Sequence, residues 1–223
     1  EAVVAEYVGE VLTGLGFTPR LQRLGSGRAT VVAVLPGRGA APGLMFNGHL
    51  DVVPPGDRPW SRPPFSPHVV DGRMYGRGTA DMKAGLAAMS LAVARLARRS
   101  APLAGDMVFA GVADEEHAGL GTHALVANGA LHGLGAVVFG EPTGLGLYIA
   151  EKGALCLEIT TEGRAAHAGM PHLGVNAIDA MIDALTRVRA LPLEGPAHPL
   201  LGPPTVTVGT IRGGVKSNVV PDA

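Results

Sequence analysis

The sequence predicts an α/β fold, in which helices cover both faces of a sheet. Short apolar runs bounded by glycine and proline predict buried strands at 29–35, 44–47, 107–113 and 136–139. Apolar side chains that recur at helical spacing predict helices at 4–15, 81–99 and 120–127. Because strands and helices alternate along the chain, we expect one sheet with helices packed on both sides.

A second, smaller domain is predicted after residue 152, where the pattern changes. Residues 155–160 alternate apolar and polar side chains, residues 177–188 are helical in pattern, and residues 205–211 alternate again. This order of strand, helix and strand is typical of an α+β unit. We therefore expect a catalytic domain at 1–152 and a second domain at 153–223.

Composition excludes several classes of partner and environment. The 223 residues carry 18 basic and 19 acidic side chains, a net charge of −1, which argues against a nucleic-acid or polybasic membrane surface. The single Cys156 excludes an intramolecular disulfide and a cysteine-based zinc site, and it is compatible with a reducing compartment. Without a long apolar run we expect no membrane span. A cytoplasmic protein with a small-molecule substrate is the expectation.

Candidate ligand groups gather where predicted strands end. They are His49 with Asp51, Asp81, the run 114–116 (Asp-Glu-Glu), and Glu141. The carboxyl ends of strands are where α/β proteins bind ligands, so these groups could converge on one site. One histidine with several carboxylates suits zinc or a neighbouring divalent ion, and a bridging carboxylate would allow two.

Each group also has an ordinary structural explanation when taken alone. Asp81 could cap the helix that follows it, and the pair Glu115 and Glu116 could be a solvated helix end. The order and context of the groups are what favour a site.

A set of motifs along the chain resembles a known enzyme family. The motifs are residues 48–54 (GHLDVVP), Trp60 with Pro64 and Phe65, residues 71–72 (DG), 75–78 (YGRG), 81–85 (DMKAG), 114–116 (DEE) and 140–143 (GEPT). Together they resemble the co-catalytic di-zinc amidohydrolases and peptidases. This family includes acetylornithine deacetylase, succinyl-diaminopimelate desuccinylase, aminoacylase and glutamate carboxypeptidase.

The resemblance implies a ligand set for two zinc ions, which cobalt or manganese could replace. His49 and Glu141 would hold one ion, Glu116 the other, and Asp81 would bridge both. The resemblance also implies a cis peptide bond after the bridging aspartate, here between Asp81 and Met82.

Two further carboxylates take part in the implied chemistry. Asp51 would orient His49, and Glu115 would be the general base that takes a proton from a metal-bridging water and returns it to the leaving amine. The reaction would be zinc-dependent cleavage of the amide bond of an N-acyl amino acid or small peptide. The motif at 140–143 is typical of the deacetylase and desuccinylase branch.

The resemblance extends into the second domain, through residues 163–177. It implies a zinc-peptidase-like catalytic domain with a mixed sheet, interrupted by an inserted ferredoxin-like lid domain that forms a homodimer. His167 would reach the partner subunit's active site and stabilise the oxyanion, and Asn218 would contact the substrate.

Part of the family pattern has no counterpart in this sequence. The family's catalytic domain resumes after the lid and supplies a last histidine ligand and a substrate-binding arginine, whereas this sequence stops at Ala223. We therefore expect a truncated chain that binds one metal ion better than two and is weakly active or inactive. The alternative function is an impaired fragment whose remaining role is dimerisation through the lid domain.

Overall fold

The computed structural model describes residues 1–99, 101–193 and 195–223. The chain divides into two compact units, Glu1–Gly146 and Leu147–Ala223. Within the described ranges, no helix combines the length and the apolar character that crossing a membrane requires.

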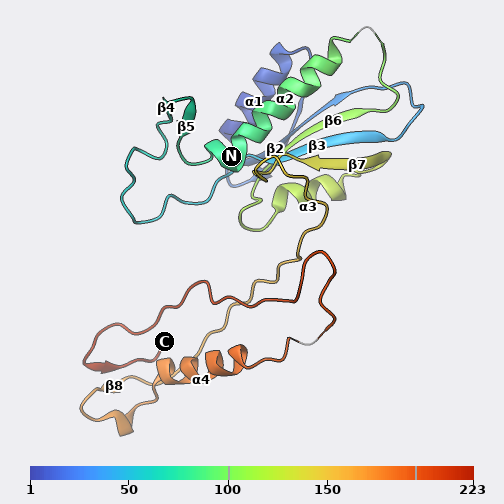
Figure 1. Cartoon of the computed structure of the whole chain (residues 1–223). Helices are drawn as coiled ribbons and strands as arrows, with labels where there is room; N and C mark the ends of the chain where they lie inside the picture. The colour runs from blue at the N-terminus through green and yellow to red at the C-terminus, as the bar shows by residue number, and fades with distance from the viewer. Residues whose placement is uncertain (100, 194) are drawn as a thin grey trace. The chain divides into compact units, whose positions relative to one another are not determined.

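The first unit is built on a five-stranded sheet (Figure 1). Its elements in chain order are α1 (Ala2–Gly14), β1 (Arg20–Gly25), β2 (Arg28–Leu35), β3 (Gly43–His49), β4 (His68–Val70), β5 (Arg73–Tyr75), a π-helical turn η1 (Thr79–Lys83), α2 (Ala84–Ala97), β6 (Met107–Val112), α3 (Leu120–Ala127) and β7 (Leu134–Phe139). The predicted helices and strands of this half are all present, with ends shifted by a few residues.

The sheet is mixed, as the sequence resemblance implies. Its strand order is β1-β2-β6-β3-β7; β1 and β2 are antiparallel, β2 and β6 are antiparallel, and β6, β3 and β7 run parallel. The short hairpin of β4 and β5 stands apart from it. Strand β1 was not predicted from the sequence, because its residues are largely polar and it lies at the sheet edge with much of its surface exposed.

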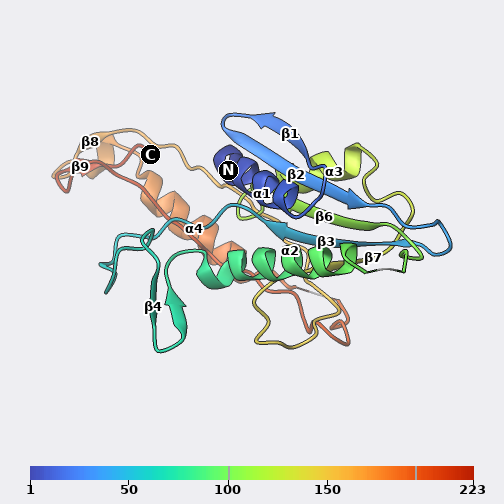
Figure 2. The same cartoon turned by 90° about the horizontal axis from the view of Figure 1, so that it is seen from above.

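Helices cover both faces of this sheet (Figure 2). Helices α1 and α2 lie on one face, where Leu12, Val93 and Phe109 belong to the larger apolar core. Helix α3 lies on the other face, where Leu125 packs with Met45 as part of a smaller core. The three parallel strands are thereby fixed between two packed layers, which holds their carboxyl ends in place.

The second unit contains little regular structure. Its elements are β8 (Ala166–His167), the 3₁₀ turn η2 (Pro171–Leu173), α4 (Ala177–Arg189) and β9 (Val219–Val220). Helix α4 confirms the predicted helix, and it begins at Asn176, whose side-chain oxygen accepts hydrogen bonds from the backbone of Ile178 (2.9 Å) and Asp179 (3.3 Å). Strands β8 and β9 pair antiparallel.

The two strands predicted at 155–160 and 205–211 are wrong for this structure. Neither segment forms a strand, and Leu155 and Leu157 are 82% and 77% exposed. Alternation of apolar and polar side chains makes a sheet only when a neighbouring strand accepts the backbone hydrogen bonds and covers the apolar face. In the described part of this unit, the paired strands are only two residues long.

Candidate metal centre

Three parallel strands deliver most of the candidate residues to one edge of the sheet. Strand β3 ends at His49, which lies opposite Val112 of β6, and the Asp-Glu-Glu run follows β6 after one more residue. The backbone N–H of Gly140, just after β7, donates to the carbonyl of Asn47 at 3.2 Å. Glu141 is therefore held beside the end of β3. Asp81 comes from η1, at the start of α2, rather than from a strand end.

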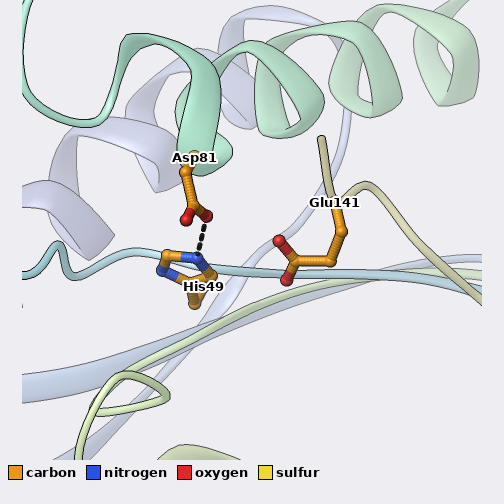
Figure 3. Close-up of side chains that lie close together, drawn as sticks. All are labelled: His49, Asp81 and Glu141. Atoms are coloured by element: carbon orange, nitrogen blue, oxygen red, sulfur yellow. Dashed lines mark hydrogen bonds and ion pairs between the residues drawn. The ribbon is translucent and has the colours of Figure 1, made fainter. Parts of the chain in front are cut away.

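His49 lies at the centre of the site and is 2% exposed. Its Nε2 lies 3.0 Å from Oδ1 of Asp81 (Figure 3). Its Nδ1 lies 3.1 Å from the carbonyl oxygen of Asp51. Its backbone N–H donates to the sulfur of Met82 at 3.0 Å. A proton on Nδ1 can be donated to the Asp51 carbonyl, which directs Nε2 toward Asp81.

Two groups of side chains could each hold a metal ion. One is His49, Asp81 and Glu141, and the other is His49, Glu115 and Glu116; in each group the ligand atoms lie within 4.8 Å of one another. Figure 3 shows the first group, with the carboxylates of Asp81 and Glu141 directed toward the imidazole. In this arrangement His49 is common to both groups, whereas the family resemblance gives the shared position to Asp81.

Asp51 connects the ends of β3 and β6. Its Oδ1 accepts a hydrogen bond from the backbone N–H of Glu115 at 3.2 Å, and its Oδ2 accepts one from Glu116 at 3.1 Å. The same Oδ1 lies 3.6 Å from Nδ1 of His49. The Asp51 side chain thus faces the imidazole and also fixes the backbone that carries both glutamates.

The charges around His49 shift its pKa upward. Burial by itself lowers the pKa, but the hydrogen bond to Asp81 and the negative charges of Glu141, Glu115 and Asp51 outweigh burial and raise the pKa above its ordinary value of 6.5. The site therefore favours a positive charge at this position.

Two glutamates have pKa values above their ordinary range. Burial raises the pKa of Glu115, His49 opposes the shift, and the charges of Glu116, Asp51 and Asp81 add to it. Burial likewise raises the pKa of Glu141, with His49 opposing. In both groups desolvation is the largest cause of the upward shift, and the neighbouring carboxylates add to it.

The donor set of the site fits a divalent cation. One imidazole with several carboxylate oxygens is a ligand set that zinc and related ions accept. A bound cation would also be attracted by the negative charges of Asp51, Glu115 and Glu141 around His49.

The segment that carries Asp81 packs tightly against the strand ends. The peptide bond between Asp81 and Met82 is cis, as the family resemblance implies. One turn further on, Gly85 lies so close to the carbonyl of Gly140 that a side chain at Gly85 would collide with it. Helix α2 and the backbone before Glu141 are therefore in direct contact.

The remaining candidates, His167 and Asn218, lie close together in the second unit. His167 belongs to β8, where it pairs with Val219, and the backbone N–H of Ala168 donates to the carbonyl of Asn218 at 3.0 Å. Nδ1 of His167 accepts the backbone N–H of Gly169 at 3.0 Å. In a neutral ring this contact places the proton on Nε2.

Sequence reasoning gave no role to Lys83 or Arg28, and it named Asp114 only within a candidate ligand run, although all three support the site. Lys83 donates from Nζ to the carbonyl of Leu50 at 2.8 Å, and burial lowers its pKa despite the nearby charge of Asp51. Asp114 is buried and paired with Arg28 at 3.1 Å. Lys83 and Asp114 stand inside the conspicuous runs 81–85 and 114–116, but nothing in the sequence spacing links Arg28 to them.

Solved structures with this fold support the architecture. A tripeptidase from Staphylococcus aureus aligns with a TM-score of 0.61 and 22% identity, covering 97% of this chain and 57% of that one. A metallo-carboxypeptidase from Sulfolobus solfataricus aligns with a TM-score of 0.59 and 21% identity, covering 82% and 43%. At these identities the likeness shows a common fold.

Sequence relatives are closer. A probable succinyl-diaminopimelate desuccinylase of Staphylococcus epidermidis is 37% identical over 190 residues, which are 85% of this chain and 46% of the relative. A probable carboxypeptidase of Aspergillus clavatus is 32% identical over 243 aligned positions, covering 100% of this chain and 56% of the relative. The chain thus spans about half the length of the curated relatives it matches.

The family pattern described as "Peptidase family M20/M25/M40" matches residues 45–206, a range that includes His49, Asp81 and Glu141 as well as the Glu115–Glu116 pair. With a match over most of its length, and a histidine and carboxylates gathered at the ends of three parallel strands, the chain belongs to peptidase family M20/M25/M40.

Proposed function

We propose that this chain carries the site of a metal-dependent hydrolase that cleaves the amide bond of an N-acyl amino acid or a small peptide. The observation that carries the proposal is the convergence of His49 with two pairs of carboxylates, Asp81 with Glu141 and Glu115 with Glu116. Membership of the peptidase family, and relatives described as a desuccinylase and a carboxypeptidase, support the reaction class.

Zinc is the proposed metal: His49, Asp81 and Glu141 would hold one ion, and Glu116 would hold a second ion that shares Asp81 with the first. When bound, the metal would polarise the scissile carbonyl and lower the pKa of the attacking water. The donor atoms of His49, Asp81 and Glu141 lie close enough together to serve one ion.

Glu115 is the proposed general base, and it moves protons without being needed as a ligand. It takes a proton from the attacking water and delivers that proton to the leaving amine nitrogen. The Asp51 side chain holds the Glu115 backbone while this occurs.

We assign His167 to stabilisation of the oxyanion in the partner subunit's active site and Asn218 to substrate binding, both in a lid domain formed by residues 153–223. A proton on Nε2 makes His167 a hydrogen-bond donor, which suits stabilisation of a developing oxyanion. The backbone contact between Ala168 and Asn218 keeps the two side chains on adjacent segments.

The decisive test replaces Glu115 by Gln in the 223-residue chain. We expect hydrolysis of a panel of N-acetyl and N-succinyl amino acids and dipeptides to fall at least ~100-fold, in line with the usual contribution of a general base, while bound zinc stays unchanged by elemental analysis. Glu6→Gln is the matched control, since Glu6 is an exposed glutamate paired with Arg23 on the surface. Measurable turnover by the parent chain that is matched by Glu115→Gln would refute the role of Glu115.

A second candidate role is self-association through residues 153–223. Large exposed apolar side chains in this segment favour it, among them Leu155, Leu157 and Val215, which is 84% exposed. Sedimentation of the 223-residue chain distinguishes the two roles. A stable dimer without turnover at any zinc loading would favour self-association as the remaining function.

A further inference from the structure

Asp114 stands directly before the two glutamates and has an unusual backbone. Its φ is 65°, in the left-handed region that aspartate tolerates better than most residues when its side chain bonds locally, and its side chain is 2% exposed. It belongs to neither candidate ligand group. A buried charge in this backbone conformation requires specific partners.

The Asp114 side chain closes the turn that follows it. Its Oδ2 lies within hydrogen-bond distance of the backbone N–H of Ala118 (3.3 Å) and of Leu120 (3.5 Å), and its carbonyl accepts the N–H of Gly119 at 2.6 Å. Leu120 is the first residue of α3, which has no side-chain cap of its own at Gly119. Asp114 therefore supplies acceptors for the start of α3 and shapes the loop 114–120.

Arg28 balances the charge of Asp114 from the start of β2. Its Nε lies 3.1 Å from Oδ1 of Asp114, across 86 positions of sequence. The carboxylate of Glu1 lies 3.6 Å from the same Nε, and Nδ1 of the exposed His117 lies 3.9 Å from Asp114. Arg28 is the close cation of this cluster, and removing it would leave Asp114 buried with its charge poorly compensated.

We propose that Asp114, paired with Arg28, is a positioning residue that sets the direction of Glu115 and Glu116. Asp51 holds the backbone N–H groups of these two glutamates from the β3 side, and Asp114 fixes the turn in which they stand from the α3 side. The two aspartates together leave the glutamate backbone little freedom. The metal-binding and catalytic consequences rest on the proposed function, whereas the backbone geometry of residues 115–120 can be measured by hydrogen exchange without either.

The test compares Asp114→Asn, Arg28→Met, Arg28→Lys and the double variant Asp114→Asn/Arg28→Met in the 223-residue chain. An amide cannot satisfy both the two backbone donors and Arg28, so we expect Co²⁺ binding to weaken ~10–100-fold, the usual effect of losing a residue that orients a metal ligand. The visible absorption bands of bound Co²⁺ should shift, and amide hydrogen exchange should accelerate at 115–120 while β3 and β6 keep their protection.

Two relations among the variants separate positioning from ordinary stabilisation. The double variant should bind Co²⁺ about as weakly as Asp114→Asn alone, because both changes break one contact, and Arg28→Lys should be intermediate. Asp106→Asn is the matched control: Asp106 precedes the other end of β6 and accepts one backbone N–H, from Gly37 at 2.8 Å. It should leave the Co²⁺ spectrum unchanged.

Unchanged Co²⁺ binding and unchanged exchange at 115–120 would overturn the proposal. Exchange that accelerates equally in β3 and β6 would also overturn it, because the pair would then be a general stability contact. Should Asp114→Asn not fold, Arg28→Met and Arg28→Lys carry the same comparison, since the Arg28 side chain is 33% exposed. If the Glu115→Gln test refutes the proposed general base, the expected Co²⁺ spectra and hydrogen exchange of the Asp114 and Arg28 variants stay the same. Failure of the proposed function and failure of this inference can therefore be told apart.

Discussion

Asp51 shows how one side chain can serve two parts of a site. Its carboxylate faces the imidazole of His49, and it accepts the backbone N–H groups of Glu115 and Glu116. The sequence motif predicts only the first contact, because His49 and Asp51 are two residues apart in the sequence. The second contact joins positions more than sixty residues apart and depends on the parallel pairing of β3 and β6.

Replacing Asp51 by Asn tests this double contact. An amide has one acceptor oxygen where the carboxylate has two, so one of the two glutamate N–H groups loses its partner. We expect zinc affinity, measured by calorimetry, to fall ~10–100-fold. Asp57→Asn is the control, since Asp57 is an exposed aspartate in the segment between β3 and β4. Zinc affinity equal to that of the parent would show that Asp51 does not orient the site.

Metal affinity should rise with pH. The pKa of His49 lies above 6.5, and those of Glu115 and Glu141 lie above 4.5, so the metal-free folded chain binds protons at these groups more tightly than the unfolded chain does. Their contribution to the stability of the metal-free chain is therefore present at low pH and is lost as pH rises through the shifted pKa values.

Zinc affinity should instead increase as pH rises, because the metal binds His49 and the carboxylates only in their deprotonated forms. Calorimetry in buffers of different ionisation enthalpy should detect protons released on binding, with affinity increasing from about pH 5 to about pH 8 around the ordinary histidine pKa. Affinity that is flat across this range would contradict the assignment of His49 as a ligand.

At the scale of elements, the site depends on how closely α2 approaches the end of β7. Gly85 on α2 faces the Gly140 carbonyl, and Glu141 follows directly. The sequence shows Gly85 only as a small residue near the start of a helix. That it allows a backbone contact is visible only once α2 has packed on the sheet.

Replacing Gly85 by Ala should displace the backbone that carries Glu141. The added methyl group collides with the Gly140 carbonyl, so we expect thermal unfolding to show a loss of about 1–3 kcal/mol and zinc affinity to fall with it. Gly14→Ala in α1 is the control, since nothing lies within 4 Å of the position that its side chain would occupy. That variant should lose no stability and could gain up to about 1 kcal/mol. A Gly85→Ala chain as stable as the control would exclude the close contact.

At the scale of the molecule, the proposed metal ligands all belong to the unit Glu1–Gly146, and Leu147–Ala223 holds the two substrate-binding candidates. The first unit has two packed apolar cores around its sheet. The second unit has long extended segments with exposed apolar side chains. The two units are therefore expected to respond differently to metal.

Zinc should stabilise the first unit and leave the second unchanged. A metal that binds only the folded state adds about 2.7 kcal/mol to the free energy of unfolding when its free concentration is a hundred times its dissociation constant. We expect hydrogen exchange to slow in β3, β6 and β7 on adding zinc, and to reverse on adding a chelator, with no change in α4. Equal protection in α4 would show that metal binding involves the second unit.

The sequence by itself determined the helices and the buried strands of the first unit and the chemical types of its donors. Local apolar spacing is enough for α1, α2, α3 and the buried strands, because those elements bury one face or both faces against neighbours that the same chain provides. The motifs around His49, Asp81 and the Asp-Glu-Glu run identified the family. The same reasoning wrongly predicted strands at 155–160 and 205–211, because a strand needs a partner strand and alternation of side chains does not provide one.

Only the tertiary structure determined which side chains lie in contact at the site. It placed His49 in both ligand groups, joined Asp51 to the glutamate backbone, and paired Arg28 with Asp114 across the sheet. These contacts follow from the strand order and the register of β2, β6 and β3. Strand order is set by the packing of the whole sheet, so a local sequence pattern does not specify which distant residues become neighbours.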